Sequence, residues 1–415
     1  MKRVVVTGIG IISSIGNNKI EVLKSLRSGS SGIFFSNEMK KIGMKSHVWG
    51  KIFLNSNVSN KNKFFKYMNT ETFFSYLAMK DAIKDSFLKK SEYQRNKKVG
   101  IIIGSGFCSS RNYVLDLNYK KKLYSKNIFK DIDNINIYTI FKIMNSTISA
   151  CLSTFFNIYG ISYSISSACA TSANCIGHAY ELIKSGRQDI VFAGGAEALT
   201  LDTALYFDKI NVLSTKFNKN PKKSSRVYDT NRDGFVISEG SGIIVLEELN
   251  SALLRNAHIY GEIISYSSNS NGNSLFLPSQ KGIERCIKSA IKKINQQPIE
   301  CINVHATSTK IGDIKEINAI TKVFMKNKYM PYISSTKSMT GHSLGASGVH
   351  EIIFLLLMLE NNFIAPSINI EMLDPKIKYT KIITYYKKIK LNIVMSNSFG
   401  FGGVNTVIIF KKFYK

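Results

Sequence analysis

Residues 166–199 read SSACATSANCIGHAYELIKSGRQDIVFAGGAEAL and predict, in this order, a turn that carries a cysteine, a helix and a buried strand. The helix is predicted by four apolar side chains that lie three or four positions apart, namely Ala173, Ile176, Tyr180 and Ile183. Gly186 is available as the C-terminal cap of this helix. The strand over residues 190–193 is apolar throughout and ends in a double glycine. An apolar strand beside an amphipathic helix is typical of an α/β protein whose sheet is covered on both faces.

The same alternation continues along the whole chain. Strands are predicted near residues 4–8, 99–104, 242–246, 259–266, 302–304, 332–334, 393–395 and 404–410, and helices near 19–27, 312–324 and 344–360. The last of these helices is apolar on every face over residues 352–358, so it has to be buried. We therefore expect it to lie between two sheets.

The composition excludes two classes of protein and leaves the meaning of the charge open. Of 415 residues 44% are hydrophobic, which excludes a disordered chain, and the length excludes a small disulfide-stapled scaffold. Lys and Arg number 56 against 28 Asp and Glu, a net charge of +28. Such an excess is expected of a protein that binds nucleic acid or an acidic surface, but a lysine-rich background composition gives the same number.

The cysteines and the apolar runs indicate the compartment. Six scattered cysteines show no C-x-x-C pair and no histidine at zinc-finger spacing, which predicts no metal site and favours a reducing, cytoplasmic location. Residues 1–12 have the charged start and apolar stretch of a signal peptide, but glycines interrupt them and no cleavage site follows, so a buried first strand is predicted. The longest aliphatic run, residues 352–359, is far shorter than the ~20 residues of a membrane span, so no membrane association is predicted.

A cysteine and two histidines stand where predicted strands end. Cys169 precedes a helix whose amides and dipole lower the pKa of a thiol, although a small buried residue is the structural alternative. His305 opens HATST and His342 lies in KSMTGHSLGA, each between a strand and the next element. This arrangement predicts a nucleophile with two imidazole partners at one edge of a sheet. The remaining histidines have unremarkable contexts: His47, His178, His258 and His350.

Four motifs in order, the segment 166–199, HATST, KSMTGHSLGASG and MSNSFGFGG, resemble the thiolase-fold β-ketoacyl-acyl-carrier-protein synthases. The opening MKRVVVTGIGIISSIGNN together with SHVWG is similar to the type I, fatty-acid-elongating members. The resemblance implies a five-layer αβαβα fold of two pseudo-symmetric halves. Residues 1–250 would carry the nucleophilic cysteine and an insertion at about 107–145, and residues 251–415 would carry both histidines.

The resemblance also implies a reaction, a decarboxylative Claisen condensation by a homodimer. No bound cofactor is implied, because the phosphopantetheine arrives on the acyl-carrier protein. Cys169 would hold the acyl chain as a thioester, while His305 and His342 donate hydrogen bonds to the malonyl thioester carbonyl. Lys337 would set the electrostatics around His342 and Glu316 would be a structural acid, with an ordinary buried ion pair as the alternative for both.

Further contacts follow from the same motifs. The backbone amides of Cys169 and Phe401 would form the oxyanion hole. Thr307 and Thr309 would bind the pantetheine arm. The acyl chain would meet Phe399 and a gate formed by Gly400 and Phe401. In some relatives a monovalent cation is held by the positions matching Asn303, Glu351, Ser396 and Asn397.

Three departures from the family pattern bear on function. Ala306 stands where the family usually has Gly, and it would strain the loop that carries His305 if that position has a positive φ. Val404 replaces a frequent Thr, a change expected to be mild. Phe107 stands where type I relatives are glycine-rich at the bottom of the acyl pocket, and we expect it to shorten the accepted chain.

Part of the charge fits an acidic carrier protein. The resemblance implies that Lys63 and Lys66 lie in a basic rim at the pocket mouth, where they would attract the acidic carrier protein. In this rim Asn62 replaces a usual Arg. Five further lysines are plausible additions to the rim: Lys120, Lys121, Lys122, Lys126 and Lys130. The rest of the +28 is attributed to composition. Three other interpretations compete with a type I condensing enzyme. The first is a type II or polyketide-like condensing enzyme, and the second is a non-catalytic carrier-binding subunit, which would be expected to lack the nucleophile. The third is a nucleic-acid-binding protein, for which no recognition module is visible.

Overall fold

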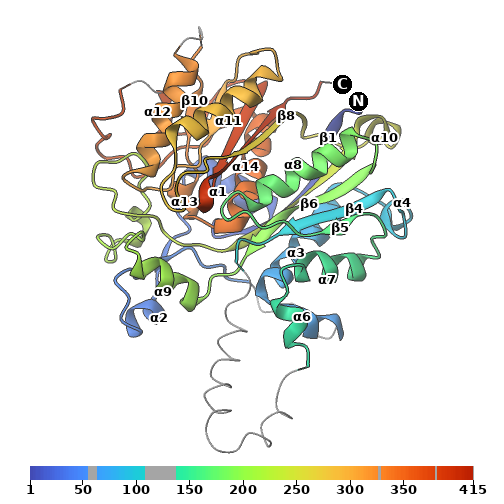
Figure 1. Ribbon diagram of the computed structural model, residues 1–415, viewed down its shortest axis with the longest axis horizontal. Helices are drawn as coiled ribbons and strands as arrows, with labels where there is room; N and C mark the ends of the chain where they lie inside the picture. The colour runs from blue at the N-terminus through green and yellow to red at the C-terminus, as the bar shows by residue number, and fades with distance from the viewer. Residues whose placement is uncertain (55–62, 108–136, 326–328, 379–380, 415) are drawn as a thin grey trace, which may run out of the picture.

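The computed structural model describes residues 1–54, 63–107, 137–325, 329–378 and 381–414, and its main feature is one long mixed sheet (Figure 1). Within these residues the sheet has eleven strands in the order β12-β10-β9-β14-β15-β8-β1-β7-β6-β4-β5. The strands of the first set are β1 (Val4–Ser13), β4 (Val99–Gly104), β5 (Ser162–Tyr163), β6 (Ile190–Glu197) and β7 (Gly240–Glu248). Those of the second set are β8 (Gly261–Ser270), β9 (Cys301–Asn303), β10 (Tyr332–Ser334), β14 (Ile393–Phe399) and β15 (Val404–Lys411), with β12 (Lys381–Ile382) added at the edge.

The two sets repeat one connectivity. In the first set β4 pairs in parallel with β5 and β6, and β7 lies antiparallel between β6 and β1. In the second set β9 pairs in parallel with β10 and β14, and β15 lies antiparallel between β14 and β8. This repeat confirms the predicted pseudo-symmetric halves. A short antiparallel contact between β1 and β8 joins the sets, so the exact division at residues 250 and 251 stays a prediction.

Helices form three layers around the two sets of strands. The outer helices α3 (Thr70–Asp85) and α7 (Thr147–Phe156) cover the first set, and α11 (Gln280–Lys292) and α12 (Gly312–Phe324) cover the second. Between the sets lie α8 (Thr171–Lys184) and α14 (Ser347–Asn361), each of which contacts strands of both. The layers therefore alternate as helix, sheet, helix, sheet, helix, as predicted for the five-layer fold.

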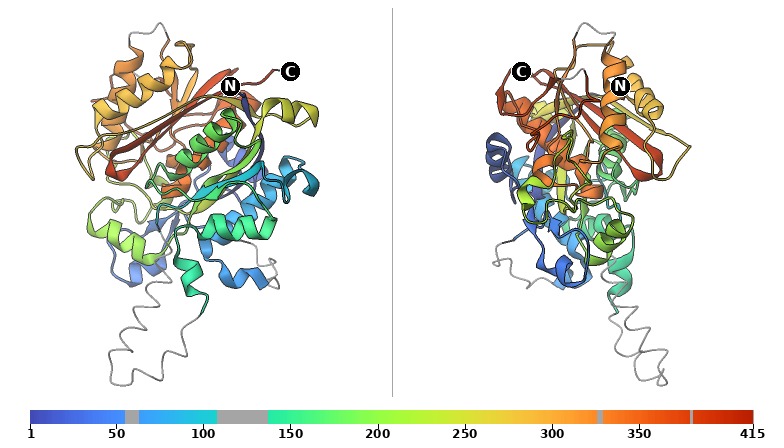
Figure 2. Two further views of the ribbon diagram at one scale, coloured as in Figure 1. Left: turned by 45° about the vertical axis from the view of Figure 1, so that its right-hand side comes forward. Right: turned by 90° about the vertical axis from the view of Figure 1, so that its left-hand side faces the viewer.

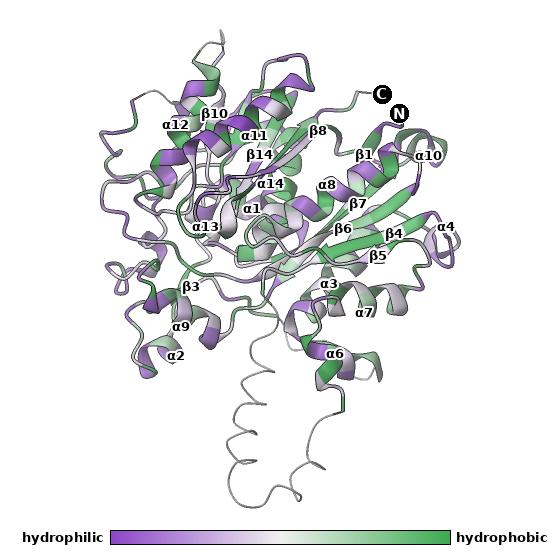
Figure 3. Cartoon of the chain, in the orientation of Figure 1, coloured by the Kyte–Doolittle hydropathy of each residue, from purple (hydrophilic) through white to green (hydrophobic). Residues whose placement is uncertain are grey.

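Helix α14 is the apolar centre of this arrangement (Figure 3). Its side chains from Ile352 to Leu359 are at most 1% exposed, as expected for a helix that is apolar on every face. The stretch Leu344–Asn361 is long and apolar enough to cross a membrane, yet 89% of it is buried inside the protein. It is accordingly a core helix of the fold.

The first strand and the smaller elements complete the molecule. β1 is buried along its whole length, as predicted, and the chain ends lie side by side, with Arg3 over the Phe413 ring at 5.9 Å (Figure 2).

The smaller helices are α1 (Lys19–Ser28), α2 (Asn37–Lys41), η1 (Lys63–Tyr67), α4 (Lys90–Tyr93), α6 (Thr139–Ile143), α9 (Leu201–Lys209), η3 (Pro221–Lys223), α10 (Leu249–Leu254), α13 (Lys337–Thr340), η4 (Leu344–Ala346) and η5 (Phe401–Gly403). The smaller strands are β2 (Phe34–Phe35), β3 (Val48–Trp49), β11 (Phe363–Ile364) and β13 (Lys387–Lys388).

Candidate active site

Cys169 lies in a tight turn just before α8. Ala168 has a φ of 49°, a left-handed conformation that costs a non-glycine residue energy and that recurs at functional turns. The turn is held by the Ser167 backbone N–H, which donates to Thr171 Oγ1 at 2.8 Å. The sequence predicts this position correctly, since the cysteine stands between a strand end and a helix start.

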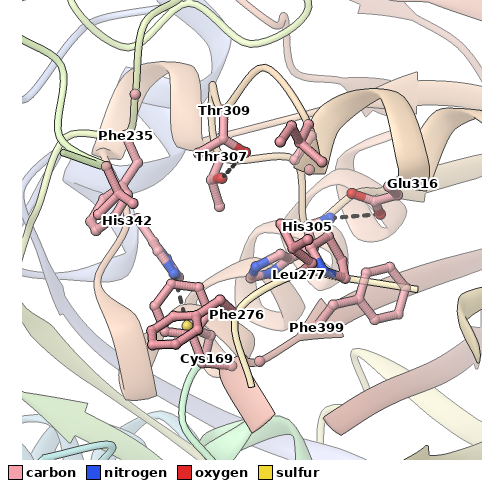
Figure 4. Close-up of a pocket in the computed structure, with 18 of the residues that line it drawn as sticks. Cys169, Phe235, Phe276, Leu277, His305, Thr307, Thr309, Glu316, His342 and Phe399 are labelled. Atoms are coloured by element: carbon pink, nitrogen blue, oxygen red, sulfur yellow. Dashed lines mark hydrogen bonds between the residues drawn. The ribbon is translucent and has the colours of Figure 1, made fainter. Parts of the chain in front are cut away.

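The two predicted histidines meet Cys169 at one place (Figure 4). His342 Nε2 lies 3.1 Å from Cys169 Sγ, and the rings of His305 and His342 are 5.3 Å apart at nearly right angles. The sulfur and one ring nitrogen of each histidine all lie within 4.8 Å of one another. The chain thus brings together residues from its two halves, separated by more than 130 positions.

The His305 loop is fixed by two buried carboxylates. The His305 backbone N–H and the Asn397 side-chain amide donate to Glu316 Oε1 at 2.9 and 3.0 Å. Asp313 accepts from three successive backbone amides, those of residues 307–309, at 3.0 to 3.2 Å. Asp313 was not predicted from the sequence, although an acid in the first turn of a helix after a loop of small residues is a recognisable signal.

Ala306 does not strain this loop. Its φ is not positive, and the left-handed residue is Ser308, with a φ of 74°. A strained loop was expected only if position 306 had a positive φ, so replacing the usual Gly by Ala306 does not strain the loop that carries His305.

Both histidines are neutral. Burial, followed by the nearby Lys337 charge, lowers the pKa of His342 well below its usual value, and the same two causes with His342 added lower the pKa of His305. Neutral imidazoles have one N–H donor and one acceptor each. They can therefore donate a hydrogen bond to a developing oxyanion or accept a proton from a thiol.

The Cys169 thiol differs from the expectation. Burial raises its pKa to about 12, and this effect outweighs the Lys337 charge and the backbone amides of Phe401 and Cys169, which face the sulfur and lower the pKa. The helix terminus alone therefore does not produce a thiolate. His342 Nε2 lies at hydrogen-bond distance from the sulfur, where a neutral imidazole can accept the thiol proton.

Lys337 and Glu316 are not paired with each other. The Lys337 ammonium forms a buried ion pair with Glu351, in which both side chains are 2% exposed. Glu351 uses Oε1 for this pair, and its Oε2 is buried with no hydrogen-bond partner among the described residues. The side-chain oxygens of Ser396 and Asn397 are likewise buried without a hydrogen-bond partner among the described residues, which fits a monovalent cation held together with Asn303 and Glu351, and that site stays a prediction.

A mostly apolar pocket opens onto the three residues. The predicted substrate contacts that line it are Thr307, Thr309, Phe399, Gly400 and Phe401, together with Cys169, His305, His342 and Glu316. Phe235, Phe276 and Leu277 add apolar walls that the sequence did not single out. Phe107 does not line this pocket directly. Its ring contacts Phe207 edge-on at 5.8 Å, and Phe207 is a lining residue.

Glu197, at the end of β6, ties the Phe107 segment to the His342 segment. Its carboxylate accepts from the backbone amides of Gly106 and Gly345 at 2.9 Å each, and from the amide of Phe107 at 3.2 Å. Burial raises its pKa to about 7. The role of Glu197 was not predicted, since a glutamate two residues after a double glycine is not by itself a recognisable signal.

The predicted basic rim is described only in part. Lys66 is exposed, and its ammonium donates to Tyr138 Oη at 2.9 Å. The Lys63 side chain lies outside the described residues, as do Asn62 and the lysines at 120–122, 126 and 130.

Fold and site together define a class, the thiolase-like α/β proteins in which a cysteine and two histidines meet at one mostly apolar pocket. Models of the β-ketoacyl synthase N-terminal and C-terminal domains match residues 1–252 and 260–371. The chain therefore belongs to the β-ketoacyl synthase family. This confirms the predicted family, and with it the predicted acyltransferase activity, the condensation that elongates fatty acids.

Curated relatives and solved structures agree with this assignment. The chain is 55% identical to the 3-oxoacyl-acyl-carrier-protein synthase 1 of Buchnera aphidicola subsp. Baizongia pistaciae, with both chains fully covered. It is 50% identical to the enzyme of the same name in Escherichia coli K12, with 99% of each covered. A β-ketoacyl synthase structure from Burkholderia phymatum matches the whole chain with a TM-score of 0.92 at 29% identity. A type II polyketide ketosynthase in complex with its acyl-carrier protein matches with a TM-score of 0.90 at 28% identity.

Proposed function

We propose that the chain takes an acyl group from acyl-carrier protein onto Cys169 and condenses it with malonyl-acyl-carrier protein. The observation that carries this proposal is the 3.1 Å contact between Cys169 Sγ and His342 Nε2, beside a second neutral histidine and two backbone amides that face the sulfur. His342 accepts the thiol proton, and the sulfur attacks the acyl thioester. The amides of Cys169 and Phe401 then stabilise the tetrahedral oxyanion.

The second half-reaction uses both imidazoles. Hydrogen bonds from His305 and His342 stabilise the enolate that forms as carbon dioxide leaves the malonyl group, and such donors act most strongly in a water-excluded site. Thr307 and Thr309 bind the pantetheine arm, and Phe399, Gly400 and Phe401 guide the acyl chain. Burial, followed by the Lys337 charge, keeps the imidazoles neutral. The test is a mixture of the purified chain with decanoyl- and malonyl-acyl-carrier protein: carbon dioxide and a 3-oxododecanoyl product are expected, and the absence of both would reject the proposal.

The competing interpretations receive less support. Identity to the type I elongating enzymes is 50–55% against 28% for the polyketide ketosynthase, and Cys169, His305 and His342 are all in place, unlike the expectation for a non-catalytic subunit. A nucleic-acid role would require a strongly salt-dependent shift of DNA without binding to acyl-carrier protein. We place the enzyme in the cytoplasm, where its carrier protein and reduced cysteines are expected.

Phe107 is proposed to limit chain length. Its large ring packs edge-on against Phe207, a residue of the pocket wall, and we expect it to keep that wall from yielding to the distal end of a long acyl chain. We expect the unmodified chain to turn over decanoyl primers faster than palmitoyl primers. In Phe107→Ala we expect palmitoyl turnover to rise by about 10-fold, because the room for one or two more methylenes changes the binding free energy of the chain by a few kcal/mol at most. Phe87→Ala, at an exposed phenylalanine outside the pocket, is the matched control. Equal turnover of the two primers by the unmodified chain would contradict the proposal.

Lys66 is proposed to attract the acidic carrier protein, together with Lys63. In Lys66→Glu we expect the KM for acyl-carrier protein to rise by about 10-fold at low salt with kcat unchanged, because exposed charges act on association and are screened by ions. Steady-state kinetics at two ionic strengths measure the effect, which should shrink at high salt. The control is Lys24→Glu, the same charge change at an exposed lysine of α1. Equal KM values for the two variants would exclude Lys66 from the docking surface.

A homodimer is proposed through the β5 edge of the sheet. β5 is the terminal strand, both of its residues are exposed, and Tyr159 and Tyr163 present 56% and 37% of their surface. A second copy paired along this edge would bond to the outward-facing backbone groups of β5 and cover the tyrosines. We expect a molar mass of twice 46.5 kDa in light scattering, and a stable monomer at micromolar concentration would contradict the dimer.

A further inference from the structure

The pocket that opens onto Cys169 has one positively charged side chain in its described wall. Apart from the two neutral histidines, the ionisable acids and bases that line it are Asp233, Glu316 and Lys310. Lys310 and its neighbour Ile311 are exposed, whereas His305 and the two threonines of the same loop are half-buried. The loop therefore leads from His305, beside the reactive sulfur, along the pocket wall to solvent at Lys310.

The Lys310 ammonium is available to a ligand. Within the described part of the chain it forms no hydrogen bond and no ion pair. Asp233 lines the same pocket, but its carboxylate accepts from the Ser214 hydroxyl at 2.8 Å and from the backbone amides of Thr215 and Lys216 at 2.8 and 2.9 Å. This acid is therefore held by its own segment, and it leaves the cation of the wall unpaired.

The backbone beneath the Lys310 side chain is fixed by Arg232, which is only 1% exposed. The Arg232 guanidinium donates to the carbonyl of Lys310 at 3.1 Å and to the carbonyl of Thr309 at 3.2 Å. It also forms ion pairs with Asp313 at 3.3 Å and with Asp374 at 2.9 Å. Since Asp313 holds the amides of residues 307–309 as well, the loop is bound through both its carbonyl and its amide groups. The base of the Lys310 side chain thus has a fixed position relative to the two threonines, and such preorganisation lowers the cost of binding.

The substrate arm carries its charge at the end remote from the thioester. A phosphopantetheine arm has the sulfur at one end, amide groups along its length and a phosphate at the other end. With the thioester at Cys169 and the amides beside Thr307 and Thr309, whose Oγ1 atoms lie 3.3 Å apart (Figure 4), the phosphate lies farther out, toward the mouth of the pocket. Lys310 is the next residue of the loop in that direction. An ammonium with three donors on a flexible stem suits a phosphate.

We propose that Lys310 binds the phosphate of the phosphopantetheine arm at the mouth of the pocket. This inference rests on the proposed function and adds a binding residue to the same site. The contact is an ion pair, so it acts on the affinity for the arm and makes or breaks no covalent bond. It differs from the proposed role of Lys66, because Lys310 lines the pocket itself and acts on the arm whether or not a carrier protein is attached.

Three malonyl donors separate the phosphate from the rest of the substrate: malonyl-acyl-carrier protein, malonyl-phosphopantetheine, and malonyl-pantetheine, which has no phosphate. Each is added to the decanoyl-enzyme formed beforehand, and release of carbon dioxide is measured against donor concentration. Lys310→Gln removes the charge, and Lys310→Arg retains it. Lys24→Gln is the matched control at an exposed lysine of α1, and Lys66→Gln removes a charge that is proposed to face the carrier protein.

In Lys310→Gln we expect the KM for malonyl-phosphopantetheine to rise by about 5-fold, the upper range for an exposed ion pair, with kcat unchanged because the phosphate takes no part in the chemistry. The rise should shrink at high salt and be absent with malonyl-pantetheine. Lys310→Arg and Lys24→Gln should keep the KM values of the unmodified chain. Lys66→Gln should raise the KM only of the donor on the carrier protein.

Three results for Lys310→Gln would overturn the phosphate contact. An unchanged KM for malonyl-phosphopantetheine would exclude it, an equal rise with malonyl-pantetheine would mean that the substitution alters the loop, and a rise confined to the carrier-bound donor would mean that Lys310 touches the carrier protein instead. In each case the proposed function stands, because the unmodified chain still turns over. Failure of the unmodified decanoyl-enzyme to release carbon dioxide from any of the three donors would reject the proposed function, and the phosphate contact with it.

Discussion

Replacing Cys169 with alanine is expected to lower condensation by at least ~10⁴-fold, because loss of a covalent nucleophile removes the acyl-enzyme route altogether. The side chain lies 3.1 Å from His342 Nε2 and is the acyl acceptor of the proposed cycle. The measurement is release of carbon dioxide and of the 3-oxoacyl product from acyl- and malonyl-acyl-carrier protein.

The control for this variant is Cys175→Ala. Cys175 is fully buried in the helix α8 that follows Cys169, its pKa is raised to about 12 by burial, and no histidine bond to it is described, so this variant should fold and retain activity. Loss of activity in Cys175→Ala with retention in Cys169→Ala would reverse the assignment.

The second large effect is expected for His305→Ala, which should separate the two half-reactions. His305 makes no described hydrogen bond to Cys169, so acyl-enzyme formation should stay near normal. Decarboxylation and condensation should fall by about 10²- to 10³-fold, the usual cost of losing one donor to a developing oxyanion. Stopped assays of acyl-enzyme and of carbon dioxide from the same reaction give both numbers.

His178→Ala is the matched control, because His178 is exposed on α8 and lies outside the pocket. Equal losses in acyl transfer and condensation in His305→Ala would mean that His305 acts in both steps or holds the fold. An unchanged condensation rate would exclude it from the reaction.

Much of the architecture was readable from local patterns. The continuous apolar strands, the cap at Gly186 and the all-apolar residues 352–358 predicted the layers correctly, because burial on two faces leaves a direct mark on the sequence. The contact that joins β1 to β8 was not predicted, since pairing between strands some 250 residues apart depends on how the halves come together.

The candidate active site was likewise predictable in part: the positions of its main residues could be predicted from the sequence, but several of their partners could not. Motif positions located Cys169, His305 and His342, which the structure brings together. The predicted direction of the Cys169 pKa shift was wrong, because a helix terminus can be read from neighbouring residues, whereas burial by residues distant in the sequence cannot. The partner of Lys337 is Glu351, one of several acids along the chain, and only the packed structure selects it. His350 had an unremarkable context in the sequence, because its contacts with Ser343 Oγ and the Ile12 carbonyl arise only when distant segments pack together.

The central claim is that Cys169 carries the acyl chain. Incubating the unmodified chain with decanoyl-acyl-carrier protein, without any malonyl substrate, and mapping the modified peptide by mass spectrometry tests it most directly. The account predicts a decanoyl adduct on Cys169 that disappears when malonyl-acyl-carrier protein is added. An adduct on another cysteine, or continued elongation with no adduct on Cys169, would contradict it.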